Sequence, residues 1–291
     1  MHLKSRKTGQ AGLKLAINDI DDNKQLNFLY IRGFLATKSG KYTHQDCSFI
    51  LRKITMNPTL NPLNAIGYGI DDYVKMFALT ENELEMNIVD CYSGASCFAK
   101  EMTSKKRNVI ACDPLYKKSI DEIQLTIEKA QKTLLSDIKA HPEWFVFTEK
   151  QAGQFIADHT GKVEAFIEDL KQGLTEKRYI HDALDHFSFK EEQFDLALMS
   201  HYLFTYSDEF SVDFHVKTIQ ELTRIANEVR IFPLVTRESH LSPYVGEVAA
   251  MLQMMGLGVE IRGVPFEIQK NGNAMMRVWS ASCSVSAHQK V

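Results

Sequence analysis

The chain has 291 residues, 44% hydrophobic and 24% charged, which is ordinary for a globular protein with one large domain or a domain plus an elaboration. A formal net charge of −3 at pH 7, without a marked run of Lys and Arg, makes nucleic acid the least favoured partner. Acids soon follow the basic start MHLKSRK, and no stretch reaches the roughly 18 apolar residues of a membrane span, so we expect a cytoplasmic protein that does not associate with membranes.

Residues 1–84 have a mixed pattern and form a predicted N-terminal accessory segment. Within it, MNPTLNPLNAIGYG is rich in Pro, Asn and Gly, which indicates a loop. The stretch DDYVKMFALTENEL that follows is typical of a helix and leads into the first clear strand.

Residues 85–235 alternate between short apolar strands and helices. Such alternation predicts a parallel sheet that is covered by helices on both faces. The expected strands cover residues 87–92, 108–113, 178–183, 194–199 and 228–235.

A helical insertion is predicted at about residues 117–177, between the second and third strands. Its apolar side chains follow helical spacing in two runs, one from Ile120 to Ile138 and one from Val163 to Leu174. We expect this insertion to lie over the carboxyl edge of the sheet and to shape a binding pocket there.

The last part of the chain predicts a helix at PYVGEVAAMLQMM and then two consecutive strands at 258–264 and 274–282. Together with the five earlier strands they give a seven-stranded, Rossmann-like α/β domain over residues 85–291. Ligands of such open sheets bind at the carboxyl ends of the strands, so the residues that end each strand carry the functional argument.

The first strand ends in Asp90-Cys91-Tyr92-Ser93-Gly94-Ala95-Ser96, and the second ends in Asp113, 113 − 90 = 23 residues later. A strand end that combines an acid, a small-residue turn and a following helix lets backbone amides approach a ligand. The carboxylate of Asp113 can accept two hydrogen bonds at once, as from a ribose. A plain strand-turn-helix, with Asp113 capping the next helix, is the alternative.

This pattern resembles motif I of class I S-adenosylmethionine-dependent methyltransferases, although Tyr92 and Ser96 stand where that family usually has its first and last glycines. The resemblance implies S-adenosylmethionine as cofactor, a mostly parallel sheet with an antiparallel terminal strand, and no metal. It also implies that a residue near the end of the third strand binds adenine. The cofactor-binding residues that we predict are Asp90, Tyr92, Ser93, Gly94, Ser96, Asp113, Asp182, Ala183 and Ser200.

The segment after the fourth strand, SHYLFTYSDEF, offers polar and aromatic side chains where a methyl acceptor would bind. His201 is the candidate general base, because its ordinary pKa lies near neutrality; alternatively it only forms hydrogen bonds. Tyr202 and Tyr206 are candidates for substrate binding, or they pack beneath the insertion. Residues 68–280 as a whole are similar to a group of bacterial methyltransferase-like proteins without an assigned substrate.

The predicted function is therefore methyl transfer from S-adenosylmethionine to an unidentified acceptor. The aromatic content of the insertion (Trp144, Phe145, Phe147) favours a small molecule. One alternative is a degenerate binding or interaction module that has kept the fold without catalysis. The other is an NAD(P)-dependent oxidoreductase, which the single glycine of the turn disfavours, because the GxGxxG fingerprint needs three. The sequence leaves the oligomeric state open.

Overall fold

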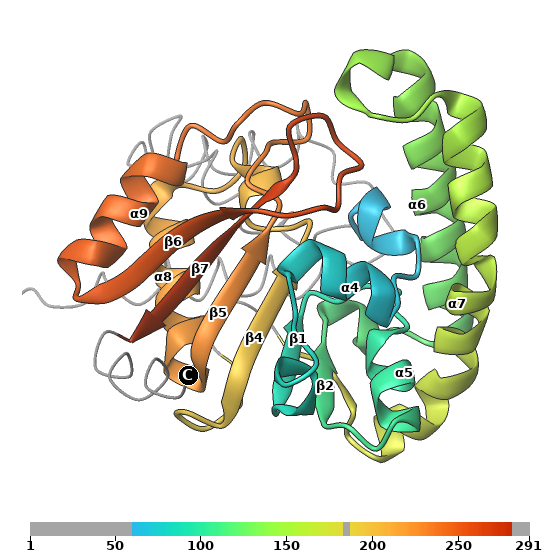
Figure 1. Ribbon diagram of the computed structural model, residues 1–291. Helices are drawn as coiled ribbons and strands as arrows, with labels where there is room; N and C mark the ends of the chain where they lie inside the picture. Colours follow the sequence, from blue (N-terminus) through green and yellow to red (C-terminus); the bar gives the residue numbers. More distant parts are fainter. Residues whose placement is uncertain (1–59, 183–186, 281–291) are drawn as a thin grey trace, which may run out of the picture. The chain divides into compact units, whose positions relative to one another are not determined.

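A seven-stranded mixed sheet forms the centre of the part of the chain that the structure describes (Figure 1). The computed structural model describes residues 60–182 and 187–280, all within the unit Thr59–Val291. The strands follow the spatial order β3-β2-β1-β4-β5-β7-β6. Their bounds are β1 Ile88–Cys91, β2 Val109–Cys112, β3 Tyr179–Ile180, β4 Phe194–Ser200, β5 Ala226–Phe232, β6 Leu257–Gly263 and β7 Ala274–Ser280.

Strands β1 to β5 run parallel to one another, whereas β7 pairs antiparallel with both β5 and β6. All seven strands expected from the sequence are present, and the α/β fold with an antiparallel final strand is confirmed.

The two faces of the sheet are covered by different helices. Successive side chains of a strand point to opposite faces, so each strand contributes to two separate cores. On β4, Leu196 and Leu198 belong to one core cluster, and Ala197 and Met199 to the other. The first cluster includes side chains of α4 (Ile70–Phe77), α5 (Phe98–Ser104), α6 (Ile120–Ala140) and α7 (Glu149–Thr175). The second includes side chains of α8 (Val212–Ile225) and α9 (Val245–Met254).

Helices α6 and α7 occupy most of the insertion predicted at residues 117–177 (Figure 1). Each begins with a capping box, Ser119 with Glu122 and Thr148 with Gln151, which satisfies amides of the first turn. Helix α7 contacts β3 and α5, and α6 contacts the short 3-10 helix η1 (Pro62–Ala65). The pair thus lies on the β3 side of the sheet and reaches the carboxyl edge through η1.

Residues 60–85, most of which fall in our predicted N-terminal segment 1–84, pack in the same unit as the sheet. The fully buried Arg230 of β5 ties them to it. Its guanidinium donates to the carbonyl of Phe77 (2.8 Å), to Glu228 of its own strand (2.6 Å) and to Glu83 in η2 (Glu83–Glu85). Within residues 60–182 and 187–280, no helix is long and apolar enough to cross a membrane.

Candidate functional site

The candidate site lies where the strand order reverses, at the carboxyl ends of β1 and β4. Strands β2 and β3 extend the sheet to one side of this point, and β4 and β5 extend it to the other. A crevice outside such a switch point is where open α/β sheets bind ligands. Asp90 is the last residue but one of β1, Ser200 ends β4, and Asp113 directly follows β2.

The turn from β1 into α5 needs an unusual backbone at two positions. Tyr92 has a φ of +57° and Gly94 a φ of +59°, a region that disfavours most L-residues. A Cβ atom at Gly94 would lie only 2.6 Å from the carbonyl oxygen of Asn64. Glycine is therefore required at position 94 for both conformation and space, whereas Tyr92 adopts the strained conformation with a side chain.

Both carboxylate oxygens of the buried Asp113 accept main-chain amides. Oδ2 accepts from Gly94 (2.9 Å), and Oδ1 accepts from Leu115 (2.7 Å), which caps the 3-10 helix η3 (Pro114–Lys117). Burial raises the pKa of Asp113 to about 6, while these two amides oppose the rise. Asp113 therefore caps η3. Since a carboxylate offers about four acceptor sites, the Asp113 carboxylate can still accept hydrogen bonds from further donors.

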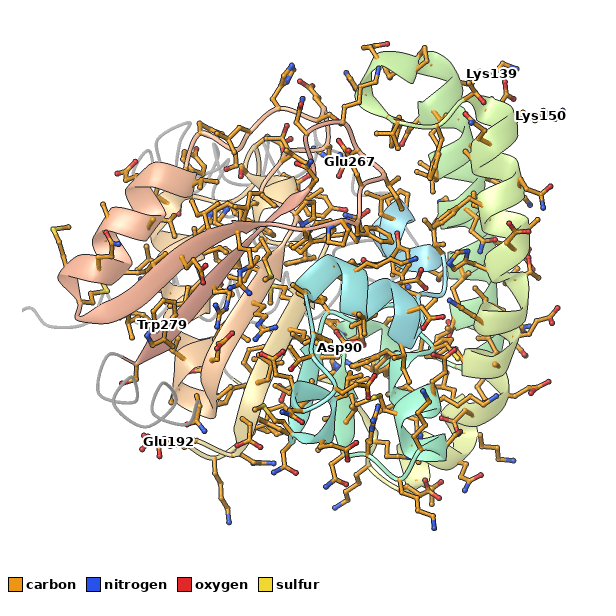
Figure 2. All side chains as sticks on the ribbon, viewed as in Figure 1. Asp90, Lys139, Lys150, Glu192, Glu267 and Trp279 are labelled. Carbon is orange, nitrogen blue, oxygen red and sulfur yellow. The ribbon has the colours of Figure 1, made fainter. Side chains whose placement is uncertain are left out.

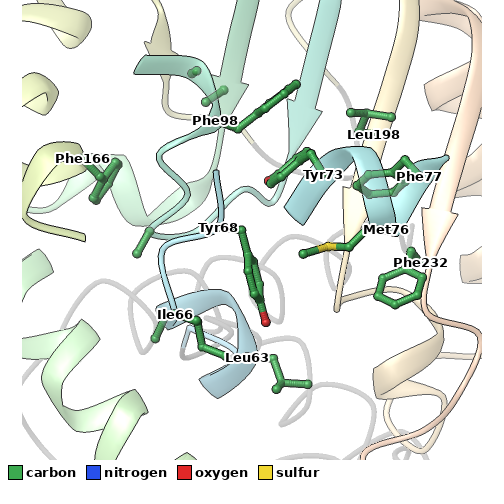
Figure 3. Packing of buried hydrophobic residues seen from close by; sticks show 14 of the residues in the cluster. Leu63, Ile66, Tyr68, Tyr73, Met76, Phe77, Phe98, Phe166, Leu198 and Phe232 are labelled. Atoms are coloured by element: carbon green, nitrogen blue, oxygen red, sulfur yellow. The ribbon is translucent and has the colours of Figure 1, made fainter. Parts of the chain in front are cut away.

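Asp90 is fully buried beneath α4 and is labelled in Figure 2. Its Oδ2 accepts a 2.6 Å hydrogen bond from the hydroxyl of Tyr73, and its Oδ1 has no partner among the described residues. Burial raises the pKa of Asp90 to about 8, and the charge of Asp113 adds to the rise. Tyr73 itself is fixed by the ring of Phe98, which stacks on it at 4.2 Å (Figure 3). The site therefore holds a carboxyl group that is mostly protonated at pH 7.

Residues 60–69, here called the strap, cross the strand ends and include η1. The side-chain amide of Asn64 donates to the carbonyls of Tyr92 (3.0 Å) and Ser200 (3.2 Å), and the backbone carbonyl of Asn64 accepts the Ala95 amide at 2.9 Å. Asn61 also donates from its side chain to the carbonyl of His201. The strap thus joins the ends of β1 and β4 through main-chain groups of both.

Other predicted cofactor residues lie around the same turn. The hydroxyl of Ser93 pairs with that of Tyr116 at 2.6 Å, and the hydroxyl of Ser96 donates to the carbonyl of Tyr68 at 3.2 Å. The structure therefore brings together seven predicted residues: Asp90, Tyr92, Ser93, Gly94, Ser96, Asp113 and Ser200.

The two predicted adenine-binding residues, Asp182 and Ala183, are not among these seven. Asp182 follows β3, and its carboxylate accepts both the amide and the hydroxyl of Ser188, each at 2.8 Å. These two hydrogen bonds lie within the loop before β4. Ala183 lies outside the described residues, so its predicted role stays a prediction.

His201, the candidate base, is buried and has a φ of +47°. Neither ring nitrogen has a hydrogen-bond partner in the described part of the chain, and the ring stacks on Tyr68 at 5.6 Å between centroids. Burial lowers the pKa of His201 to about 3, so the ring is neutral near pH 7 and accepts a proton poorly. Its surroundings suit a neutral hydrogen-bonding group better than a general base.

The predicted substrate residues Tyr202 and Tyr206 belong to the core cluster on the α8 and α9 face, opposite to α4. The ring of Tyr202 lies 3.9 Å from that of Tyr92, and Arg237 lies 5.1 Å above the ring of Tyr206. The rings of the insertion are also packed, since Phe145 is buried in the first cluster and Trp144 and Phe147 border it. These contacts account for the rings without a substrate.

No group of three or more His, Cys, Asp and Glu within the described residues is arranged to hold a metal ion. Cys91 and Cys112, side by side on β1 and β2, are free thiols with sulfurs 3.6 Å apart.

Four site residues were not predicted from the sequence: Asn61, Asn64, Tyr68 and Tyr73. All four come from the stretch that we assigned to a loop and a following helix outside the domain. The available signal was the pair of asparagines in NPLNAIGYG, since short polar side chains in a loop often bind main-chain groups.

The comparisons with known proteins give one clear relative. No family model matches the chain. The uncharacterized protein MJ0045 of Methanocaldococcus jannaschii is 30% identical over 215 residues, which cover 72% of this chain and 93% of that protein. The chain belongs to the MJ0045 family. No activity is stated in the relative's name.

Solved structures also resemble this MJ0045-family chain, at low identity. A SAM dependent methyltransferase from Aquifex aeolicus is 14% identical, with a TM-score of 0.38, over 75% of this chain and 97% of that one. A magnesium protoporphyrin IX methyltransferase from Synechocystis is 9% identical, with a TM-score of 0.38, over 69% of this chain and 73% of that one. The fold assignment rests on topology instead: the order β3-β2-β1-β4-β5-β7-β6, with β7 antiparallel to both neighbours, agrees with the mostly parallel sheet and antiparallel terminal strand that the sequence resemblance implies.

Proposed function

We propose that this protein is an S-adenosylmethionine-dependent methyltransferase that acts on a small organic acceptor. The observation that carries the proposal is the group of polar atoms at the switch point of a class I methyltransferase sheet. Asp90 and Asp113 lie there beside the turn that contains Gly94, and main-chain carbonyls of both central strands point into the same region.

The residues present fit the cofactor's chemistry. Asp113, at the end of β2, is suited to a ribose, because its carboxylate has acceptor capacity beyond the amides of Gly94 and Leu115. The carbonyls of Tyr92 and Ser200 accept an N–H group and the amide of Ala95 donates to an oxygen. An α-amino-acid end, with its ammonium and carboxylate, needs this combination of acceptors and donors.

When bound, S-adenosylmethionine supplies a methyl group on a positively charged sulfur. The protein's own tasks are to align the acceptor with that methyl group and to exclude water. Deep burial of Asp90, Ser200 and His201 suits the second task. A mostly protonated Asp90 also avoids placing a second full negative charge beside Asp113.

The acceptor belongs, in this proposal, beyond the end of β4. There the hydroxyls of Tyr68 and Thr205 and the ring nitrogens of His201 are buried without partners in the described residues. Buried polar groups normally have hydrogen bonds, so unpaired ones favour a ligand with donors and acceptors of its own. Phe232 and Phe266 border Tyr68 and His201, which favours an organic molecule of modest polarity.

A second candidate function is a binding or interaction module that no longer uses the cofactor. The observation in its favour is Asn64, which fills the space beside Gly94 and bonds to the main-chain groups just described. The two candidates differ in whether the strap can be displaced by an adenosyl ligand.

The test is the free energy of unfolding with and without S-adenosylhomocysteine, measured by denaturant titration. Ligand at 100 times its dissociation constant should add about 2.7 kcal/mol, because only the folded state binds it. Asp113→Asn should weaken the ligand at least about tenfold, since hydrogen bonds to a charged group are worth roughly 1.5–3 kcal/mol. The matched control Asp121→Asn, at an exposed position of α6, should leave the stabilisation intact. No stabilisation at millimolar ligand would leave the non-catalytic module as the better account.

A further inference from the structure

Asn64 holds main-chain groups in a pattern that matches one part of the proposed ligand. Its side-chain NH2 donates to two carbonyls, those of Tyr92 and Ser200, at 3.0 and 3.2 Å. Its backbone carbonyl accepts the amide of Ala95 at 2.9 Å. One residue therefore presents a donor to the ends of both central strands and an acceptor to the glycine turn.

The α-amino-acid end of S-adenosylmethionine presents the same pair of functions, an ammonium donor and a carboxylate acceptor. It would need the groups that Asn64 already holds. Space gives a second reason for competition, because a Cβ at Gly94 would meet the Asn64 carbonyl oxygen at 2.6 Å, its Cβ at 2.8 Å and Leu60 at 2.9 Å. The amino-acid end and Asn64 cannot occupy this space together.

Several contacts hold the strap in place independently of Asn64. Asn61 donates to the carbonyl of His201, Gln131 of α6 donates to the carbonyl of Ala65 at 2.8 Å, and the amide of Cys97 donates to the carbonyl of Tyr68 at 2.8 Å. Asn64 is consequently positioned at the strand ends by its neighbours, and a ligand has to work against these contacts as well.

The nucleoside end of an adenosyl ligand would be recognised elsewhere. Asp113, the proposed ribose-binding group, accepts hydrogen bonds from the amides of Gly94 and Leu115, and neither bond involves Asn64. A nucleoside that lacks the amino-acid end therefore has no need to displace Asn64. The competition should lower the affinity only of ligands that carry the amino-acid end.

We infer that Asn64 is a specificity-determining residue that competes with the amino-acid end of adenosyl ligands for the main-chain groups of Tyr92, Ala95 and Ser200. The inference rests on the proposed function. S-adenosylhomocysteine carries an amino-acid end that 5′-methylthioadenosine lacks, and the polar groups of that end should strengthen binding. Competition from Asn64 cancels part of this gain in affinity. The apparent affinity for S-adenosylhomocysteine is the intrinsic affinity multiplied by the small fraction of molecules in which Asn64 has left the site.

The experiment compares the dissociation constants of both ligands by calorimetry, for the wild-type chain and for Asn64→Ala. The variant should bind S-adenosylhomocysteine about tenfold more tightly, because the hydrogen bonds from the Asn64 side chain to the carbonyls of Tyr92 and Ser200 no longer have to be broken. Its affinity for 5′-methylthioadenosine should stay within about twofold, which also shows that the variant is folded. Asn64→Ser, whose side chain is too short to join the two carbonyls, should likewise bind S-adenosylhomocysteine more tightly and leave the affinity for 5′-methylthioadenosine within about twofold.

The matched control is Asn108→Ala, at an exposed asparagine whose side chain donates to the side chain of Asn87. It should change neither affinity. If Asn64→Ala weakens S-adenosylhomocysteine, Asn64 helps to hold the ligand and the inference is wrong. It is equally wrong if both ligands bind and the ratio of their affinities stays the same in both Asn64 variants. If neither ligand binds the wild-type chain or any variant, the proposed function itself fails, and the inference fails with it.

Discussion

The hydrogen bond from Tyr73 to Asp90 leads to a prediction whose size depends on pH. Both side chains are fully buried, and the two oxygens lie 2.6 Å apart. Tyr73→Phe removes the hydroxyl and keeps the ring that stacks on Phe98. The carboxyl of Asp90 then loses its hydrogen bond, and the packing around it stays largely the same.

The magnitude follows from the protonation state of Asp90. In the folded protein its pKa is raised to about 8, whereas an unfolded Asp ionises near pH 3.9. The stability that this group contributes is thus present below about pH 4 and is lost as pH rises toward 8, since the unfolded chain ionises first. At pH 6 the variant loses a hydrogen bond to a neutral carboxyl, about 1 kcal/mol. At pH 9 it loses one to a carboxylate, roughly 1.5–3 kcal/mol.

The assay is denaturant unfolding at both pH values, with Tyr179→Phe as the matched control. The hydroxyl of Tyr179 donates to Asp169 at 3.0 Å. Burial raises the pKa of Asp169, but its hydrogen bonds to Arg178 and Tyr179 outweigh this and lower the pKa overall, so Asp169 is ionised at both pH values. The control should cost the same free energy at pH 6 and pH 9. A Tyr73→Phe cost that does not grow with pH would refute the assignment of a protonated Asp90.

Three further predictions concern the frame of the site. Arg230→Ala should lower the free energy of unfolding in a denaturant titration by about 3–5 kcal/mol, because it leaves buried partners unpaired. The control Arg262→Ala, at a half-exposed arginine, should lower it by less than about 1 kcal/mol. Gly94→Ala should destabilise the fold by at least about 1–2 kcal/mol through the positive φ of Gly94 alone. Gly246→Ala in α9, where a Cβ atom meets open space, should stabilise the fold by up to about 1 kcal/mol. Equal effects of the two substitutions would contradict the contact between Gly94 and the strap. The pKa of about 3 for His201 predicts a ring that stays neutral between pH 5 and pH 8 in a ring-nitrogen NMR titration, and protonation in that window would show that the site is open to solvent.

The sheet could be predicted from sequence because its strands are short, apolar and regularly separated by helices. Strand β4 is an example: Phe194 to Met199 form a nearly continuous apolar run, as a strand covered on both faces requires. The long helices of the insertion were equally readable, since the five buried residues of α6 keep the predicted helical spacing. In both cases local periodicity carries the information.

The acids of the site were also within reach, because Asp90 and Asp113 stand at the ends of recognisable strands. Asn64 was not, because its role depends on contacts with residues 28 and 136 positions away in the chain. No local pattern distinguishes such an asparagine from an ordinary loop residue. Tyr202 and Tyr206 illustrate the reverse difficulty, since an aromatic residue at a strand end can point to either face of the sheet.

The central claim is that an adenosyl cofactor binds at the carboxyl ends of β1, β2 and β4. A crystal structure of the full chain with S-adenosylhomocysteine tests it most directly. The account predicts ligand density with the ribose hydroxyls at the carboxylate of Asp113 and the amino-acid end between the carbonyls of Tyr92 and Ser200, with Asn64 displaced. Ligand density elsewhere on the protein, or a site at these strand ends still closed by Asn64 at saturating ligand, would contradict it.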